Sequence, residues 1–167
     1  SDMFPMRLVA RAGDVAVDLT LTDAKPIVQH GRDGFSVKTR DGGAASYYYS
    51  FTRVNTEGAV VVGGRRHAVA GASWIDREWS TSVLDTRHTG WDWFSLQFDD
   101  RTELMCFRMR HADGPESSHT AGTFIDEAGS AFPLAPGDVE IEETDSWTSA
   151  TNGGTYPSEW RIRIPSQ

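Results

Sequence analysis

The stretch that decides the fold is WDWFSLQFDDRTELMCFRMR, residues 91–110. Apolar and polar side chains alternate through both of its halves, which is the two-residue period of a half-buried β-strand. A polar segment, residues 99–102, separates the halves and has the composition of a turn. We therefore expect an antiparallel hairpin in which Asp100 and Arg101 form a two-residue loop.

That register sorts the side chains of the hairpin between two faces, because directly opposed residues point to the same side. One face is apolar throughout its centre. The other face places Trp91 opposite Arg110 and Trp93 opposite Arg108. Each of these pairs suits cation–π stacking, which is worth roughly 0.5–2 kcal/mol.

The mixed face has two interpretations, and the sequence leaves both open. Its tryptophans can lie on the outside, with their rings covered by arginine stems or by a neighbouring domain. Alternatively, the face is the lumen of a barrel or the wall of a cleft, since ligand pockets combine aromatic walls with a few polar groups.

The same alternating pattern recurs along the rest of the chain at short intervals, with turn residues between the segments. No stretch sustains the 3.6-residue period of a long amphipathic helix. Further strands are expected at residues 15–21, 46–54, 59–62, 67–75, 122–125, 139–143 and 160–164. The predicted fold class is therefore all-β with little helix, either an antiparallel barrel or a barrel-like sandwich.

Length and charge restrict the classes of protein that fit. A chain of 167 residues has room for one domain with a hydrophobic core, so we expect residues 1–167 to form a single domain. The formal charge of −8, with sixteen scattered Lys and Arg residues, argues against nucleic acid as the main partner. No apolar run approaches the roughly 18 residues that a transmembrane helix requires.

Metal and thiol chemistry find little support in the sequence. Cys106 is the single cysteine, so there is no internal disulfide and no cysteine-based metal pattern. It lies between two apolar residues of a predicted strand, which indicates a packing role. The five histidines show no i, i+4 pairing, so we expect solvated or hydrogen-bonded histidines and no metal site.

Two acids lie in the segment SWIDREW, residues 73–79. Strand periodicity places Trp74, Asp76 and Glu78 on one face. Like charges at that spacing, beside an apolar wall, raise the pKa of one carboxyl group, which then stays protonated and can act as a general acid. The alternative is that both acids form ion pairs with arginines such as Arg108.

Five segments occur in the order seen in one protein family: SYYYSFTRV, GASWIDREWS, GWDWFSLQFDDRTELMCFRMR, GTFIDEAG and YPSEWRIRIP. From about residue 7 to residue 165 the chain resembles the AttH-like and carotenoid 1,2-hydratase (hydroxyneurosporene synthase) family. The resemblance implies a lipocalin-like β architecture. Family proteins are typically about twice this length and contain two such domains, so it also implies that the chain is an internal portion of a longer protein.

The resemblance further implies a class of ligand. Family members of known activity act on long apolar molecules, and this includes the hydration of carotenoid end groups without a redox cofactor. Related fungal proteins catalyse cyclisations of polyenes. The WIDREW segment resembles the AttH-like branch more closely than the carotenoid hydratases, so the identity of the substrate does not transfer.

Together, the residues and the resemblance predict a domain that binds an extended hydrophobic molecule of isoprenoid, polyene or lipid-like type. Whether it is an enzyme stays open; if so, it is a hydratase-type lyase or a cyclase without a cofactor, and Asp76 or Glu78 is its acid. Indole faces would stabilise developing positive charge, and one tyrosine would orient water. The expected ligand-binding residues are Trp74, Trp91, Trp93, Arg108, Tyr48 and Tyr49.

Two alternatives come from other classes of protein. The first is a carrier that has the same pocket and catalyses no reaction. The second is an interaction domain that uses its Trp/Arg face to bind a second copy of itself or a complementing domain. The compartment is also left open: a bacterial soluble protein of this composition can be cytoplasmic, periplasmic or secreted.

Overall fold

The computed structural model describes residues 3–39, 42–80, 86–114 and 119–165. These residues form twelve strands and contain no helix that could cross a membrane. The strands are β1 (Met6–Ala12), β2 (Val15–Asp23), β3 (Val28–Gln29), β4 (Phe35–Val37), β5 (Ala45–Val62), β6 (Arg65–Trp79), β7 (His88–Gln97), β8 (Glu103–His111), β9 (His119–Ile125), β10 (Ala131–Leu134), β11 (Glu140–Thr148) and β12 (Thr155–Arg163). The prediction of an all-β fold is confirmed.

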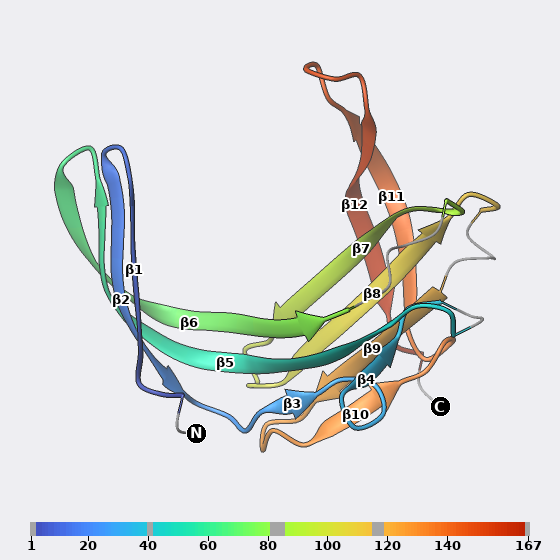
Figure 1. Ribbon diagram of the computed structural model, residues 1–167, viewed down its shortest axis with the longest axis horizontal. Coiled ribbons are helices and arrows are strands. Elements are labelled where there is room, and N and C mark those ends of the chain that lie inside the picture. Colours follow the sequence, from blue (N-terminus) through green and yellow to red (C-terminus); the bar gives the residue numbers. More distant parts are fainter. Residues whose placement is uncertain (1–2, 40–41, 81–85, 115–118, 166–167) are drawn as a thin grey trace.

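The largest sheet, sheet A, is built around β5 and β6, two long strands that curve strongly along their length (Figure 1). One end of β5 pairs with β2, which pairs with β1, and its other end pairs with β3 and β4. A β-bulge interrupts the β5–β6 ladder between Phe51 and Val54. Bulges bend a strand, so this irregularity helps one continuous strand to serve two regions of the molecule.

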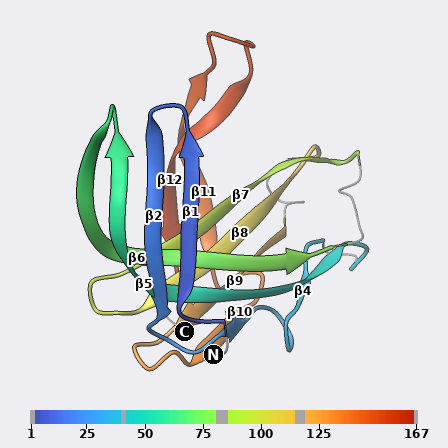
Figure 2. The same cartoon turned by 60° about the vertical axis from the view of Figure 1, so that its left-hand side comes forward.

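Sheet B, in the order β10-β9-β8-β7, is antiparallel and lies between two neighbours. On one face, Met105, Phe107 and Met109 pack with Tyr48 of sheet A. On the other face, Leu104 and Cys106 pack against the β11–β12 hairpin. Figure 2 shows β5 and β6 crossing β7 and β8, as expected for packed sheets. The described strands form a barrel-like sandwich and no closed barrel.

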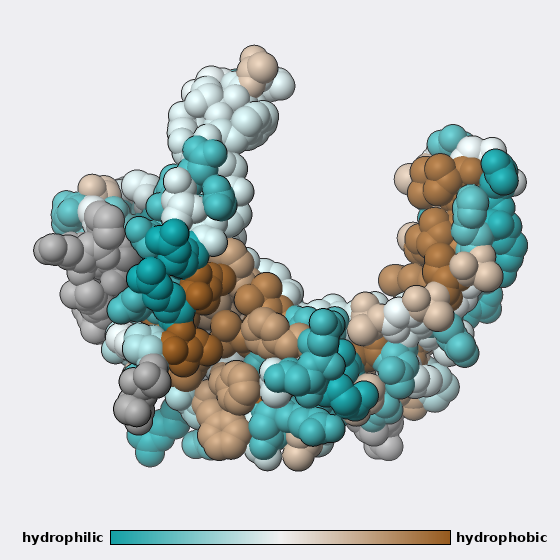
Figure 3. Space-filling model, turned by 180° about the vertical axis from the view of Figure 1, so that it is seen from behind, coloured by the Kyte–Doolittle hydropathy of each residue, from teal (hydrophilic) through white to brown (hydrophobic). Residues whose placement is uncertain are grey.

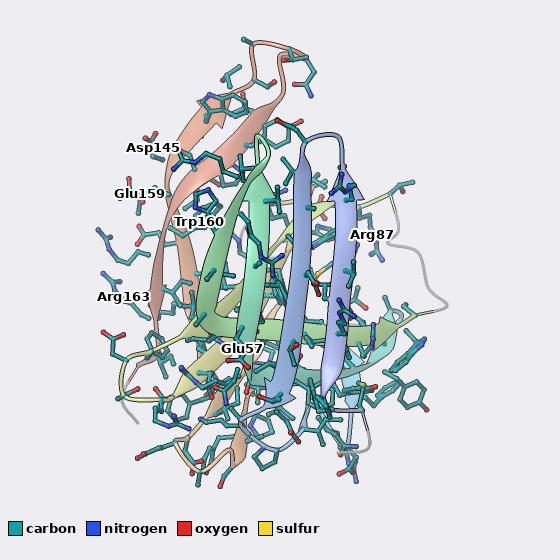
Figure 4. The ribbon with its side chains drawn as sticks, turned by 90° about the vertical axis from the view of Figure 1, so that its left-hand side faces the viewer. Glu57, Arg87, Asp145, Glu159, Trp160 and Arg163 are labelled. Carbon is teal, nitrogen blue, oxygen red and sulfur yellow. The ribbon has the colours of Figure 1, made fainter. Side chains whose placement is uncertain are left out.

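The sheets leave a broad hollow that is open on one side (Figure 3). The ends of β1–β2 and β5–β6 form one arm beside it, and the β11–β12 hairpin forms the other (Figure 1). Hydrophobic side chains gather on the side of the first arm that faces the hollow (Figure 3). The second arm is mostly hydrophilic, and Asp145, Glu159 and Arg163 are spaced along it (Figure 4).

The β7–β8 hairpin is present, but its predicted register is wrong by one residue. Trp93 lies opposite Phe107 and Asp92 lies opposite Arg108. The turn is longer than two residues, because the N–H of Arg101 donates to the carbonyl of Phe98 at 3.1 Å and Arg101 adopts a left-handed φ of 65°. A turn closed by a left-handed residue adds one residue to the loop and shifts every cross-strand partner.

A buried ion cluster ties this hairpin to sheet A. The Glu103 carboxylate, which has no exposed side-chain area, accepts from the Lys25 ammonium at 2.7 Å and from Arg53 at 2.5 Å. Lys25 also donates to the backbone carbonyls of Arg101 and Asp126. The Lys25 ammonium thus has three acceptors within the protein. It needs them because its side chain is only 2% exposed to water.

Candidate functional site

The sequence predicts that Trp74, Asp76 and Glu78 share a face of β6. In the structure, Asp76 contacts Trp74 and two residues of β5. Oδ1 of Asp76 accepts a hydrogen bond from the Tyr48 hydroxyl at 2.7 Å and another from Trp74 Nε1 at 2.9 Å. The Ser50 hydroxyl donates a third. All three bonds end on the same oxygen, so the carboxylate is held in one orientation while Oδ2 receives none of them.

Tyr48 connects this carboxylate to the tryptophans of β7. Its hydroxyl donates to Asp76 and accepts from Trp93 Nε1 at 3.2 Å. Burial, followed by the hydrogen bond to Asp76 and the charge of that carboxylate, raises the pKa of Tyr48 far above its usual range. The hydroxyl therefore stays protonated and continues to donate to Asp76.

A buried histidine extends the network beyond Ser50. His30 Nε2 lies 2.9 Å from Ser50 Oγ, and Nδ1 lies 2.9 Å from Thr123 Oγ1 on β9. Because the Ser50 hydroxyl gives its one hydrogen to Asp76, Nε2 of His30 must donate to Ser50 and Nδ1 must accept from Thr123. Burial lowers the pKa of His30 to about 4, so the ring is neutral at pH 7.

This histidine links folding stability to pH. Its pKa is about 4 in the folded chain, against an ordinary value of 6.5. Between these values the unfolded chain binds a proton that the folded chain does not, so stability falls as the pH drops through this window. The full difference corresponds to about 3 kcal/mol. We expect urea unfolding at pH 7 and at pH 4.5 to show a loss of stability that is clearly smaller in His30→Gln, and equal losses in the two proteins would contradict this assignment.

Glu78 has a different environment from Asp76. Its Oε1 atom accepts from the Lys38 ammonium at 2.8 Å and from the Ser46 hydroxyl at 2.6 Å. Burial raises the pKa of Glu78, but these two hydrogen bonds and the charge of Lys38 outweigh it, and the net pKa is lowered. Glu78 is therefore ionised at neutral pH, and it is not the carboxyl group whose pKa crowding was expected to raise.

A pocket of about 240 Å³, which we call the first pocket, opens beside Glu78. Its apolar wall comes from sheet B and consists of Trp91, Trp93, Phe107 and Met109. Its polar wall comes from the chain around β4, β5 and β6 and consists of Lys38, Ser46, Glu78 and Ser80. The Lys38 ammonium also lies 4.5 Å from the centre of the Phe107 ring, so it contacts both walls. The arrangement suits a molecule with one apolar and one polar end.

Trp93 joins the first pocket to the Asp76 network, because it lines the pocket and donates to Tyr48. Asp76 and Tyr48 are not among the residues that line the pocket. Tyr48 is only 2% exposed, whereas Asp76 is partly exposed. Asp76 is thus the more accessible of these two groups.

Two of the predicted site residues lie elsewhere. The corrected register places Arg108 on the opposite face of sheet B from Trp93, where it pairs with Asp92 at 2.7 Å. The predicted stacking of Arg108 on Trp93 is therefore wrong. Tyr49 points to the opposite side of sheet A from Tyr48, and its ring lies 5.5 Å from that of Trp79.

The structure adds residues that the sequence reasoning did not assign to the site. Ser46 and Ser50 share the face of Tyr48 by strand alternation, so the sequence held a signal for them. His30 was expected to be solvated or hydrogen-bonded, and it is buried and hydrogen-bonded. Lys38 carries no local signal, because the pairing of β4 and β6 with β5 brings it beside Glu78, and the packing of sheet A on sheet B brings it beside Phe107.

Within the described residues, no group of three or more His, Cys, Asp or Glu side chains could hold a metal ion. Cys106 is buried, and burial raises its pKa to about 12. A thiol with that pKa is a poor nucleophile at neutral pH, in agreement with a packing role.

The family is decided by a sequence comparison over the whole chain: the family model described as AttH-like matches residues 1–167. The chain belongs to the AttH-like family. No curated protein matches it. A crystal structure of an AttH protein from Nitrosomonas europaea is 32% identical, with a TM-score of 0.86 over 95% of this chain and 49% of that one.

Kievitone hydratase from Nectria haematococca is a second solved structure with this fold. It is 20% identical, with a TM-score of 0.74 over 95% of this chain and 48% of that one. The AttH-like chain thus spans about half the length of both solved proteins. Both comparisons confirm the predicted lipocalin-like β architecture.

Proposed function

We propose that the first pocket binds a hydrophobic small molecule with one polar end, and that the protein adds water to a carbon–carbon double bond of that molecule without a cofactor. One observation carries the proposal: an apolar wall that includes Trp91, Trp93 and Phe107 faces an ionised Glu78 paired with Lys38. Pockets for small molecules combine apolar walls with a few fixed polar groups in this way.

Hydration of an alkene requires a proton for one carbon and a water molecule for the other. We assign the proton to Oδ2 of Asp76, the oxygen that receives none of the three hydrogen bonds, after the carboxylate has taken this proton from solvent; the three donors to Oδ1 stabilise the carboxylate that forms again when the proton is transferred. The faces of Trp91 and Trp93 then stabilise the cationic carbon. Water forms the new C–O bond, and its surplus proton passes to the Glu78 carboxylate.

The two carboxyl groups return to their starting states by proton exchange with solvent, since both are partly or largely exposed. The reaction changes no oxidation state overall, so it needs no redox partner. The sequence analysis names Glu78 as a candidate acid. Its lowered pKa suits a proton acceptor, so we assign Glu78 the role of a base instead.

The fold shared with kievitone hydratase supports addition of water as the first reaction to test, and kievitone as the first substrate. The protein is incubated with kievitone in ¹⁸O-labelled water, and the products are analysed by mass spectrometry. A product heavier by one labelled water supports hydration. Quenching of tryptophan fluorescence without a product supports the alternative function, a carrier that binds the ligand and catalyses no reaction.

A matched pair of variants tests the pocket itself. Trp93→Ala removes part of the apolar wall, and we expect it to weaken ligand binding about tenfold or more, or about 1.4 kcal/mol. Trp147→Ala removes a 57% exposed indole on β11, outside the first pocket, and is expected to leave binding unchanged. Equal affinities for the two variants would contradict the proposed site.

A further inference from the structure

A second pocket, of about 360 Å³, lies between the chain around β4 and the strands β8, β9 and β10. Phe107 lines both this pocket and the first one. Its ring is buried, packs with Tyr48 and lies 4.5 Å from the Lys38 ammonium, so these side chains separate the two pockets. The second pocket is therefore a separate site, and the reaction proposed for the first pocket makes no use of it.

Most of the second pocket is apolar. Sheet B contributes Met105 together with Ala121 and Gly122, whose small size leaves the space unfilled. The chain around β4 contributes Phe35 and Val37, and the end of β10 adds aliphatic and proline side chains. The volume lies within the range of small-molecule sites, which is roughly 300–1,000 Å³. These walls suit the compact apolar body of a small molecule.

Three polar side chains interrupt the apolar lining: Arg32, Ser36 and His119. Ser36 and His119 are buried, with 4% and 8% of their surface exposed, whereas Arg32 is exposed at the rim. Within the described part of the chain, neither the Arg32 guanidinium nor the Ser36 hydroxyl makes a side-chain hydrogen bond or an ion pair. Both groups are therefore available to a ligand.

A tight turn fixes the position of Arg32 beside β4. The N–H of Arg32 donates to the carbonyl of Phe35 at 3.0 Å, and the N–H of Phe35 donates back at 2.9 Å. Between them, Asp33 and Gly34 adopt left-handed φ values of 53° and 86°, as in a type I′ turn, which an Asp-Gly pair favours. The backbone that carries the guanidinium is thus held at the rim of the pocket before any ligand arrives.

We propose that the second pocket binds a small aromatic monocarboxylate, with its ring among the apolar walls and its carboxylate at Arg32 and Ser36. A guanidinium binds a carboxylate through two parallel N–H donors, and the serine hydroxyl can donate a third hydrogen bond. The single cation of the site matches one negative charge. A dianion such as a phosphate ester would keep one charge uncompensated beside apolar walls, which is costly.

The test uses naphthoate as the probe and naphthamide as a neutral compound of nearly the same shape. Each is titrated into the ¹⁵N-labelled protein, and binding is followed through the amide signals in NMR spectra. We expect naphthoate to bind with a dissociation constant below about 1 mM and to shift the signals of Ser36, Ala121 and Gly122. Naphthamide should bind about tenfold more weakly or worse, because it cannot form the charge-assisted pair.

Three variants examine the two parts of the site. Arg32→Gln changes an exposed side chain and should weaken naphthoate about tenfold or more while leaving naphthamide unaffected. Ala121→Leu occupies the pocket and should weaken both compounds. Arg77→Gln is the matched control, because it removes the same charge from an exposed residue of β6 that lines neither pocket, and both affinities should stay unchanged.

Several results would overturn the proposed site: no saturable binding of naphthoate, equal affinity for the two compounds, or the same affinity for naphthoate in Arg32→Gln and Arg77→Gln. Shifts confined to Trp91 and Trp93 would place the probe in the first pocket and would also overturn it. The inference does not depend on the proposed hydration, which the labelled-water experiment tests separately.

Discussion

Replacement of Asp76 by asparagine should reduce the turnover number for hydration by about 10²–10⁴-fold and leave ligand affinity nearly unchanged. Asparagine keeps the shape of the side chain and an oxygen that can accept from Tyr48 and Trp74, but it carries no proton that it can give to a carbon atom. The measurement compares kcat and KM of the two proteins by mass spectrometry in labelled water.

Two further variants control this experiment. Asp145→Asn changes a carboxylate on β11, away from the first pocket, and should leave kcat unchanged. Tyr48→Phe removes one donor to Oδ1 without removing the proposed acid, so it should have a smaller effect than Asp76→Asn. If Asp76→Asn unfolds at markedly lower urea concentration but retains kcat, Asp76 is a structural residue and the proposed mechanism is wrong.

The largest expected effect on stability comes from Glu103→Ala. The substitution leaves the Lys25 ammonium, whose side chain is 2% exposed, without the carboxylate that lies 2.7 Å away. Breaking a buried ion pair by removing one partner costs about 3–5 kcal/mol. Urea unfolding followed by circular dichroism should show this loss in the free energy of unfolding.

An exposed ion pair of the same chain is the matched control. Arg161 and Glu142 lie 3.1 Å apart, and their side chains are 54% and 56% exposed. Glu142→Ala should change the free energy of unfolding very little, because water screens such pairs. If the two substitutions have the same effect, Lys25 gains enough solvent or other partners in Glu103→Ala to offset the missing charge, and the buried cluster does not stabilise the fold.

The β7–β8 hairpin shows that an alternating sequence pattern predicts strands but does not predict how they pair. Alternation of apolar and polar residues is a property of each strand, so the existence and approximate bounds of both strands were predictable. The register depends on the length of the turn, and Arg101 is an unusual residue for a left-handed position. One extra loop residue moved Arg108 from the side of Trp93 to the side of Asp92.

Asp76 and Glu78 of β6 show a second limit of prediction from the sequence. Strand periodicity correctly placed Trp74 and Asp76 together, because side chains of alternate residues point to the same face. The same periodicity could not separate the environments of Asp76 and Glu78. Lys38 and Ser46, which are distant in sequence, donate to Glu78, and these hydrogen bonds together with the charge of Lys38 lower the pKa of Glu78.

The sequence by itself determined the all-β class, the family and the residues that share a face within each strand. These follow from the two-residue period of strands and from segments read directly along the chain. Only the tertiary structure decided which faces meet: Phe107 beside Lys38, His30 between Ser50 and Thr123, and Glu103 around Lys25. The reason is physical, because burial and long-range pairing set the charge and hydrogen bonding of each group, and both depend on residues that are remote in the chain.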